Sequence, residues 1–199
     1  MSSAVAVRTA TAADEARILD VITLAFAADP PCRWLYPDPQ QYLTNFPKFA
    51  HGFGGRAFQH GSAYCTDDYL GAALWLPPDV HPDDEALDAV LERSVSESQR
   101  KVVSETFGQI ANYRPSEPHW HLAIVGVDPA QQRRGHGSLL MQRGLMPCDR
   151  DGQLVYLEST NPSNLPFYGR HGFDLLGTIQ VVAAVPPIFP MLRRPRPQA

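Results

Sequence analysis

The sequence predicts a single domain of mixed α/β (α+β) class, with a largely antiparallel sheet flanked by helices. The chain has 199 residues, which is typical of one domain and enough to bury a sizeable core. Segments with apolar residues at helical spacing alternate with short apolar segments typical of strands. Their order is strand, two helices, two strands, helices, and then strand, helix, strand, helix and two strands.

The composition is that of an ordinary globular protein and argues against several other classes. Hydrophobic residues make up 44% of the chain and charged residues 19%. The net charge of -4 argues against a nucleic-acid-binding protein, which usually has a strongly basic face. The cysteines Cys32, Cys65 and Cys148 fit neither a disulfide framework nor a zinc site. We see no secretory leader and no membrane-spanning stretch, and we expect a cytoplasmic protein without a membrane partner or a bound metal.

The chain is predicted to begin with a strand and an amphipathic helix. Residues 4–8 alternate as in a strand. Thr11 and Asp14 then form a capping box, and apolar residues at helical spacing extend the helix to about Phe26. The segment 29–39 is rich in proline and is interpreted as a loop.

A second helix, a hairpin and a longer helical region are predicted next. From about Gln40, aromatic side chains recur at spacings of four, three and four, which is typical of one helix face. Residues 62–67 and 69–76 read as a hairpin that ends at two prolines. Residues 79–118 are polar and helix-prone, and residues 119–127 form a strand apolar enough to be central in the sheet.

The last part of the chain is predicted to alternate helices and strands. A helix begins at Gly135, and Pro147 should end or kink it early. It is followed by a strand over 154–159, a short helix from Pro162, and strands near 173–178 and 179–185. The Pro/Arg-rich tail, about 193–199, is expected to be loose.

The segment 131–140 has the features of an anion site. Arg133 and Arg134 precede the triplet Gly135-His136-Gly137, and an apolar helix begins there. The first amides of a helix lack helical partners and the helix dipole favours negative charge, so a pyrophosphate would fit. The alternative is a tight turn with solvated arginines. The segment has neither the Walker pattern nor a Rossmann pattern.

Two segments, one at the glycine triplet and one at residues 157–173, resemble the two signatures of the GNAT superfamily of N-acetyltransferases. Gln132-x-x-Gly135-x-Gly137 after a strand resembles the acetyl-CoA signature, and residues 157–173 resemble the second signature, with Asn, Phe-Tyr and Gly-Phe in order. Together they span about residues 119 to 173. Within the superfamily, the motifs and a helical insertion at about 79–118 look most like the puromycin N-acetyltransferase-like group.

This resemblance implies a fold and an activity. The fold would be GNAT-like, with a mostly antiparallel twisted sheet and splayed central strands. The activity would be transfer of an acetyl group from acetyl-CoA to the primary amine of a small molecule, directly in a ternary complex. The alternative is a domain that senses acyl-CoA without catalysis. No nucleic-acid partner is expected, and the oligomeric state is left open between monomer and homodimer.

The resemblance also implies which residues contact the cofactor. These lie on the central strand, in the glycine loop and on the short helix: Val125, Gly126, Val127, Gln132, Arg133, Arg134, Gly135, His136, Gly137, Ser138, Asn164 and Tyr168. Gly126 within a strand indicates a bulge or a close backbone approach. Tyr168 matches the general acid that protonates the leaving thiolate, and the alternative is a core tyrosine.

The proton acceptor and the amine pocket are less well defined by the sequence. An alkylammonium with a pKa of about 10.4 is deprotonated in only about one molecule in 2,500 at pH 7, so a base is needed. Glu158 is the first candidate and His121 the second, with His119 behind them; all three could be merely structural. Trp34, Tyr36 and Trp75 are expected to contact the substrate, whereas the helical Phe46 and Phe49 are expected in the core.

Overall fold

The computed structural model describes residues 5–196 and confirms the mixed α+β class, with a seven-stranded sheet in the described chain. The strands lie in the order β1-β2-β3-β4-β5-β7-β6, and all neighbours are antiparallel except β4 and β5. The elements are β1 (Val7–Thr9), η1 (Ala12–Asp14), α1 (Glu15–Ala25), α2 (Pro30–Leu35), α3 (Pro39–Gly54), α4 (Arg56–Gln59), β2 (Ala63–Thr66), β3 (Gly71–Leu76), α5 (Asp84–Ser94), α6 (Glu97–Ala111), β4 (His119–Val127), η2 (Pro129–Gln131), α7 (His136–Arg150), β5 (Leu154–Ser159), η3 (Pro162–Asn164), α8 (Leu165–Arg170), β6 (Phe173–Leu175) and β7 (Phe189–Arg193).

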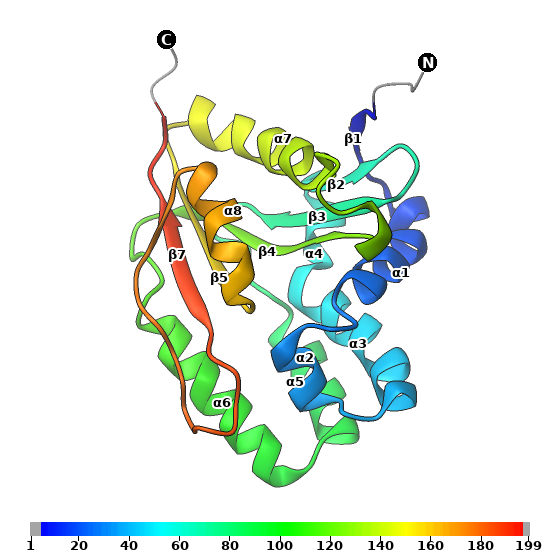
Figure 1. Ribbon diagram of the computed structural model, residues 1–199. Coiled ribbons are helices and arrows are strands. Elements are labelled where there is room, and N and C mark those ends of the chain that lie inside the picture. The colour runs from blue at the N-terminus through cyan, green and yellow to red at the C-terminus, as the bar shows by residue number, and fades with distance from the viewer. Residues whose placement is uncertain (1–4, 197–199) are drawn as a thin grey trace.

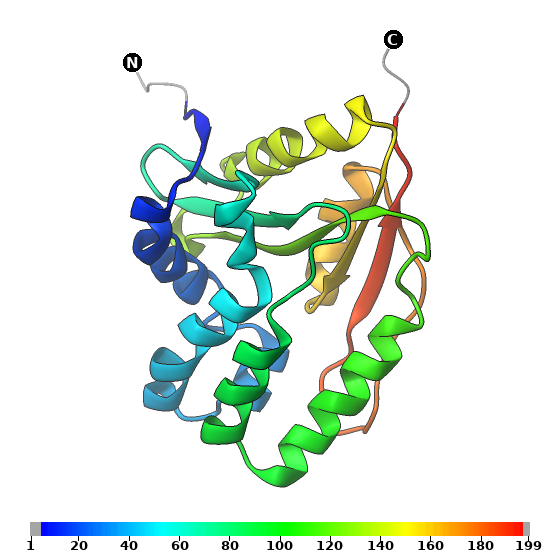
Figure 2. The same ribbon diagram turned by 180° about the vertical axis from the view of Figure 1, so that it is seen from behind.

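Helices cover both faces of the sheet, and a separate apolar cluster lies under each cover. One cluster joins α1 and α3 to the sheet through residues such as Ile22, Phe46 and Leu74. The other joins α7 and α8 to the opposite face through residues such as Leu140 and Tyr168. Figures 1 and 2 show α7 crossing one side of the sheet, while α5 and α6 extend away from its other side.

The two central parallel strands separate soon after they meet. β4 pairs with β5 only between His119–His121 and Leu154–Tyr156. Beyond His121, β4 keeps β3 as a neighbour but loses β5, so the backbone of residues 122–127 has one edge without a strand partner. The splayed central strands expected from the resemblance are therefore present.

The segment read as a proline-rich loop contains a short helix, so that prediction was wrong. Asp29 adopts an extended conformation and its carboxylate accepts a hydrogen bond from the amide of Cys32 at 3.3 Å. Pro30 and Pro31 then occupy the first helical positions, where a missing N–H costs nothing. The signal that we overlooked is an aspartate followed by proline, a pattern typical of the first turn of a helix.

Of the two effects expected of Pro147, an early end of α7 is not observed. The helix continues for three residues to Arg150. Leu145 and Cys148 flank the proline and are buried, and the thiol of Cys148 donates to the carbonyl of Gly144 at 3.3 Å. Packing against the sheet therefore outweighs the lost hydrogen bond.

The final strand lies later in the chain than predicted. Residues 179–185 form bends and a turn, with one isolated bridge from Ile179 to Ile188, and the strand β7 begins at Phe189 and inserts between β5 and β6. Arg193, expected in a loose tail, is 1% exposed and donates two hydrogen bonds to Asp149, at 2.7 and 2.8 Å. The tail residues 197–199 lie outside the described part of the chain.

Candidate active site

A groove of about 900 Å³ runs along the free edge of β4. It is bounded by the end of α1, the start of α7 and the helix α8. The predicted cofactor residues that line it are Val125, Gly126, Val127, Gln132, Arg133, Gly135, His136, Gly137, Ser138, Asn164 and Tyr168. Arg134 is outside the lining; its guanidinium donates to the side chain of Gln131 at 2.9 Å. The structure thus brings eleven of the twelve residues to one surface.

The loop before α7 has an unusual backbone that favours an anion. Arg133 and Gly135 both have positive φ, at 62° and 94°. Such alternation turns successive amides toward one concavity, and no side chain caps the start of α7. His136 is 5% exposed, and its buried Nδ1 has no hydrogen-bond partner in the described residues. The loop therefore offers free donors and the positive end of a helix to the groove.

Two glycines allow the elements around the groove to approach closely. A Cβ on Gly126 would lie 2.8 Å from the Cβ of Ala25, so only glycine lets α1 pack on this part of β4. A Cβ on Gly137 would lie 3.4 Å from the ring of Phe167 on α8. Of the two roles considered for Gly126, close approach is the one observed. The register shift in β4 lies opposite Leu74 and Trp75 instead.

A second cavity, of about 190 Å³, adjoins the groove. Its walls come from α2, α3, α6, the free part of β4, the end of β5 and the segment before β7. Phe26, Val125, Asn164 and Tyr168 line both spaces. We call the two spaces the groove and the acceptor cavity. They meet at Tyr168.

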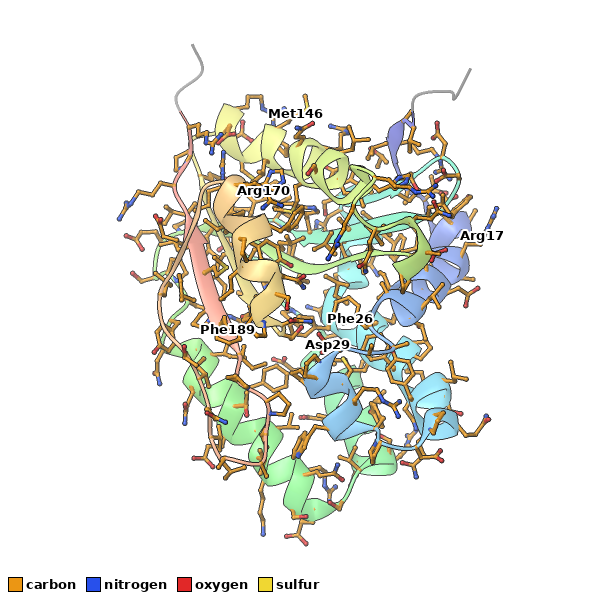
Figure 3. All side chains as sticks on the ribbon, viewed as in Figure 1. Arg17, Phe26, Asp29, Met146, Arg170 and Phe189 are labelled. Atoms are coloured by element: carbon orange, nitrogen blue, oxygen red, sulfur yellow. The ribbon has the colours of Figure 1, made fainter. Side chains whose placement is uncertain are left out.

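Tyr168 lies on α8 and is 8% exposed. Burial raises the pKa of its phenol above the usual value, and the nearby carboxylate of Asp29 raises it further. The hydroxyl is therefore protonated at neutral pH and able to donate. Asp29, at the start of α2 and labelled in Figure 3, accepts a hydrogen bond from Thr160 at 2.5 Å. This contact joins α2 to the end of β5. Burial raises the pKa of the Asp29 carboxyl as well.

The structure brings together two of the candidate bases. Oε2 of Glu158 lies 2.7 Å from Nε2 of His121, and both side chains are buried. Oε1 of Glu158 lies 3.5 Å from the guanidinium of Arg114. Burial alone would raise the pKa of Glu158, but His121 and Arg114 outweigh it and the pKa is lowered. His119 lies farther out, with its Nδ1 2.8 Å from the carbonyl oxygen of Glu117, and burial lowers its pKa.

The predicted aromatic contacts are only partly correct. Trp34 lines the acceptor cavity. Tyr36 is fully buried with its hydroxyl 2.9 Å from that of Ser94, and it does not reach the cavity. Trp75 is also fully buried, and a Cβ on Gly144 would lie only 2.1 Å from its ring, so it serves as core.

The aromatic stripe of α3 lies in the core and also forms part of the wall of the acceptor cavity. Phe46 is in the core as expected and Phe49 packs against it, and both also line the acceptor cavity together with Phe53. The rings of Phe46 and Phe49 are stacked with centroids 6.5 Å apart, and those of Phe49 and Phe53 are 6.0 Å apart. The stripe was visible in the sequence, but which face it would present to a cavity was not.

Asp29, Thr160 and Arg114 were missed by sequence reasoning. Asp29 could have been found as the N-cap before two prolines. Arg114 carries no local signal, because its approach to Glu158 depends on how α6 returns to β4.

Comparison with known families finds a match for part of the chain. Residues 94–175 match the family model described as the acetyltransferase (GNAT) domain. This part of the chain is therefore similar to the acetyltransferase (GNAT) domain. The match begins within α5 and ends within β6, so it includes the glycine loop, Glu158 and Tyr168.

Two curated relatives carry acetyltransferase names. An uncharacterized N-acetyltransferase of Schizosaccharomyces pombe is 25% identical over 170 residues, covering 75% of this chain and 66% of its own length. The mycothiol acetyltransferase of Mycolicibacterium gilvum is 35% identical over 95 residues, covering 44% of this chain and 27% of its own. The chain therefore spans just under two thirds of the first relative and about a quarter of the second. The family model and both relatives thus carry the name of an acetyltransferase.

Solved structures share the whole GNAT fold. One described as histone acetyltransferase HPA2 and related acetyltransferase, from Corynebacterium glutamicum, has a TM-score of 0.70 at 24% identity and covers 99% of both chains. Arylalkylamine N-acetyltransferase 2 from Aedes aegypti has a TM-score of 0.68 at 13% identity, covering 98% of this chain and 100% of its own. An agmatine N-acetyltransferase has a TM-score of 0.65 at 14% identity, covering 96% and 100%. At these identities the likeness shows the fold. No helix in the described chain is both long and apolar enough to cross a membrane.

Proposed function

We propose that this protein transfers an acetyl group from acetyl-CoA to the primary amine of a small molecule, directly in a ternary complex. The observation that carries the proposal is the meeting of the groove and the acceptor cavity at Tyr168. Two ligands held in these spaces would touch at one point, as direct transfer requires. The likeness to the puromycin N-acetyltransferase-like group, whose helical insertion corresponds to α5 and α6 here, favours a small-molecule acceptor.

The groove has the donors that acetyl-CoA needs. The amides at the start of α7 and Arg133 would hold the pyrophosphate. The free edge of β4 at Val125–Val127 and the amide of Asn164 would pair with the pantetheine arm. Acetyl-CoA supplies the acetyl group as an activated thioester. A backbone amide of Val125–Val127 would stabilise negative charge on the carbonyl oxygen.

Tyr168 and Glu158 would handle the protons. The substrate nitrogen bonds to the acetyl carbon as the carbon–sulfur bond breaks, and the Tyr168 hydroxyl donates its proton to the departing sulfur. The nitrogen loses one proton, and Glu158 hydrogen-bonded to His121 is the proposed acceptor. The lowered pKa of Glu158 makes it a carboxylate over the whole physiological range, ready to accept a hydrogen bond from the amine.

We also propose a reducing compartment, the cytoplasm. Cys32, Cys65 and Cys148 are all free, and burial raises the pKa of the Cys148 thiol to about 12, which keeps it unreactive.

Thermal unfolding with and without acetyl-CoA, followed by CoA-thiol release with a panel of amines, tests this function. At about 100 times its dissociation constant a ligand adds roughly 2.7 kcal/mol, which should raise the melting temperature by about 5 to 11 °C. An absent shift would refute cofactor binding. A shift without thiol release from any amine would instead favour the non-catalytic acyl-CoA sensor.

A further inference from the structure

The acceptor cavity has one carboxylate in an otherwise apolar lining. Among the described residues that line it, Glu158 is the only charged side chain. Polar side chains on the lining are few: Thr106, Thr160, Asn164 and Tyr168. The remaining lining is aliphatic or aromatic, apart from Cys32. The cavity therefore has a counter-charge for one amino group and for no second cation.

Glu158 also has an unused acceptor. Its side chain is 6% exposed, and Oε1 has no hydrogen-bond partner among the described residues. The guanidinium of Arg114 lies 3.5 Å from Oε1 without forming a hydrogen bond, while Oε2 is engaged by His121. A buried carboxylate oxygen without a donor is costly, so a donor supplied by a ligand would be favoured.

The size and walls of the cavity limit the body of that ligand. An apolar cavity of about 150 Å³ holds one benzene ring. The acceptor cavity, about 190 Å³, is slightly larger. Phe46, Phe49 and Phe53 present stacked rings along α3, and Phe107 continues the row from α6 with its centroid 6.3 Å from that of Phe53. Such walls suit one flat ring with a short chain.

From these observations we infer that the acceptor is a primary amine on a single aromatic ring or a similarly compact apolar group, without a second charge. This inference rests on the proposed function and specifies its substrate class. The amino group donates to Oε1 of Glu158, and the ring lies between α3 and α6. A diamine or a guanidino-amine held within this lining would place its second cation against apolar walls without a carboxylate partner, which is strongly unfavourable. The carboxylates of Asp84, Asp88 and Glu92 line a separate cavity on the other side of Phe53 and Phe107.

The first experiment measures binding separately from turnover. Calorimetry on the full chain saturated with CoA compares 2-phenylethylamine, agmatine and spermidine. We expect 2-phenylethylamine to bind at least tenfold more tightly than either of the others. Equal or tighter binding of agmatine or spermidine, or no binding of 2-phenylethylamine, would overturn the inference. Tight binding of 2-phenylethylamine without thiol release from acetyl-CoA would support the substrate class and overturn the proposed catalysis.

The second test adds a negative charge to the cavity wall and measures how the ratio of the affinities for agmatine and 2-phenylethylamine changes. Thr106→Glu adds a second carboxylate to the α6 wall of the cavity and should shift the ratio of affinities toward agmatine by at least tenfold. Gln109→Glu adds the same charge on the same helix at a position that lines neither the acceptor cavity nor its neighbour, and should leave the ratio unchanged. Both variants are first checked for folding by their acetyl-CoA affinity, with Thr106→Asp as the smaller replacement. An unchanged ratio in a folded Thr106 variant would contradict the inference.

Discussion

Tyr168 is the residue whose position most directly links the structure to the chemistry, because it lines both the groove and the acceptor cavity. Its raised pKa keeps the phenol protonated at neutral pH, so its hydroxyl can donate to the negative charge that would develop on the departing sulfur. Removing the hydroxyl should therefore slow the chemical step while leaving the groove intact.

We expect Tyr168→Phe to lower kcat by about 10² to 10⁴-fold with little change in acetyl-CoA affinity. Thiol-release kinetics and calorimetry measure the two effects. Tyr64→Phe is the matched control, since Tyr64 is also buried but lines neither the groove nor the acceptor cavity. Full activity of the Tyr168 variant would show that another group protonates the thiolate.

At the residue scale, it was easier to predict which residues belong to the candidate site than which of them contact each other. The motifs singled out Glu158, His121 and Tyr168, and all three lie at or beside the acceptor cavity. The sequence did not show that Glu158 and His121 touch, because they lie on different strands that meet only by the parallel pairing of β4 and β5. Tyr36 failed as a substrate residue because α2 turns it inward, and that helix was itself missed.

Among the elements, the loop before α7 is the one with the clearest ligand requirement. Gly135 has a φ of 94° and open space around its Cα, so nothing in the protein itself explains the exposed concavity there. A side chain at this position would be strained, and a carboxylate would also face the bound pyrophosphate.

We expect Gly135→Asp to weaken acetyl-CoA binding by at least tenfold, measured by calorimetry. Gly152→Asp is the control, because Gly152 also has positive φ, at 65°, and open space, yet lies past the far end of α7. Both variants place the same new charge at a glycine of positive φ, so a loss of affinity in Gly135→Asp alone points to the anion site. Equal affinities would mean that the loop does not hold the pyrophosphate.

Periodicity predicted most elements but not their partners. The stripes of α1 and α3, the hairpin β2–β3 and the strand β4 follow directly from local apolar patterns. β7 could not be found in this way, since Pro190 argues against a strand while the apolar run at 179–185 imitates one. Pairing with β5 on one side and β6 on the other overrides the local signal.

On the scale of the whole molecule, one ion pair joins the last strand, β7, to the helix α7 that packs on the sheet. Arg193 at the end of β7 donates to both oxygens of Asp149 on α7 and also to the carbonyl of His171 at 2.9 Å. Three parts of the chain, β7, α7 and the residue after α8, therefore meet at one buried guanidinium. Removing this guanidinium should lower the global stability of the protein, because β7 pairs with both β5 and β6 in the sheet.

We expect Arg193→Met to lower the free energy of unfolding by about 3 kcal/mol at neutral pH, the lower end for breaking a buried ion pair, because Asp149 is 23% exposed. The melting temperature should fall by about 6 to 12 °C. Arg194→Met, an exposed neighbour, should change little and is the matched control.

The same ion pair predicts how this loss depends on pH. Burial alone would raise the pKa of Asp149, but the hydrogen bonds from Arg193 outweigh it and lower the pKa below its usual range. A carboxyl with a lowered folded-state pKa contributes its full stabilisation above the unfolded value, about 3.9, and loses it as the pH falls through the folded value. The difference in unfolding free energy between the wild type and Arg193→Met should therefore be constant near neutral pH and shrink below about pH 4. Urea titrations between pH 7 and pH 3 measure it. A difference that stays constant throughout would place the contribution of Arg193 in its packing and in the carbonyl of His171, and not in its charge.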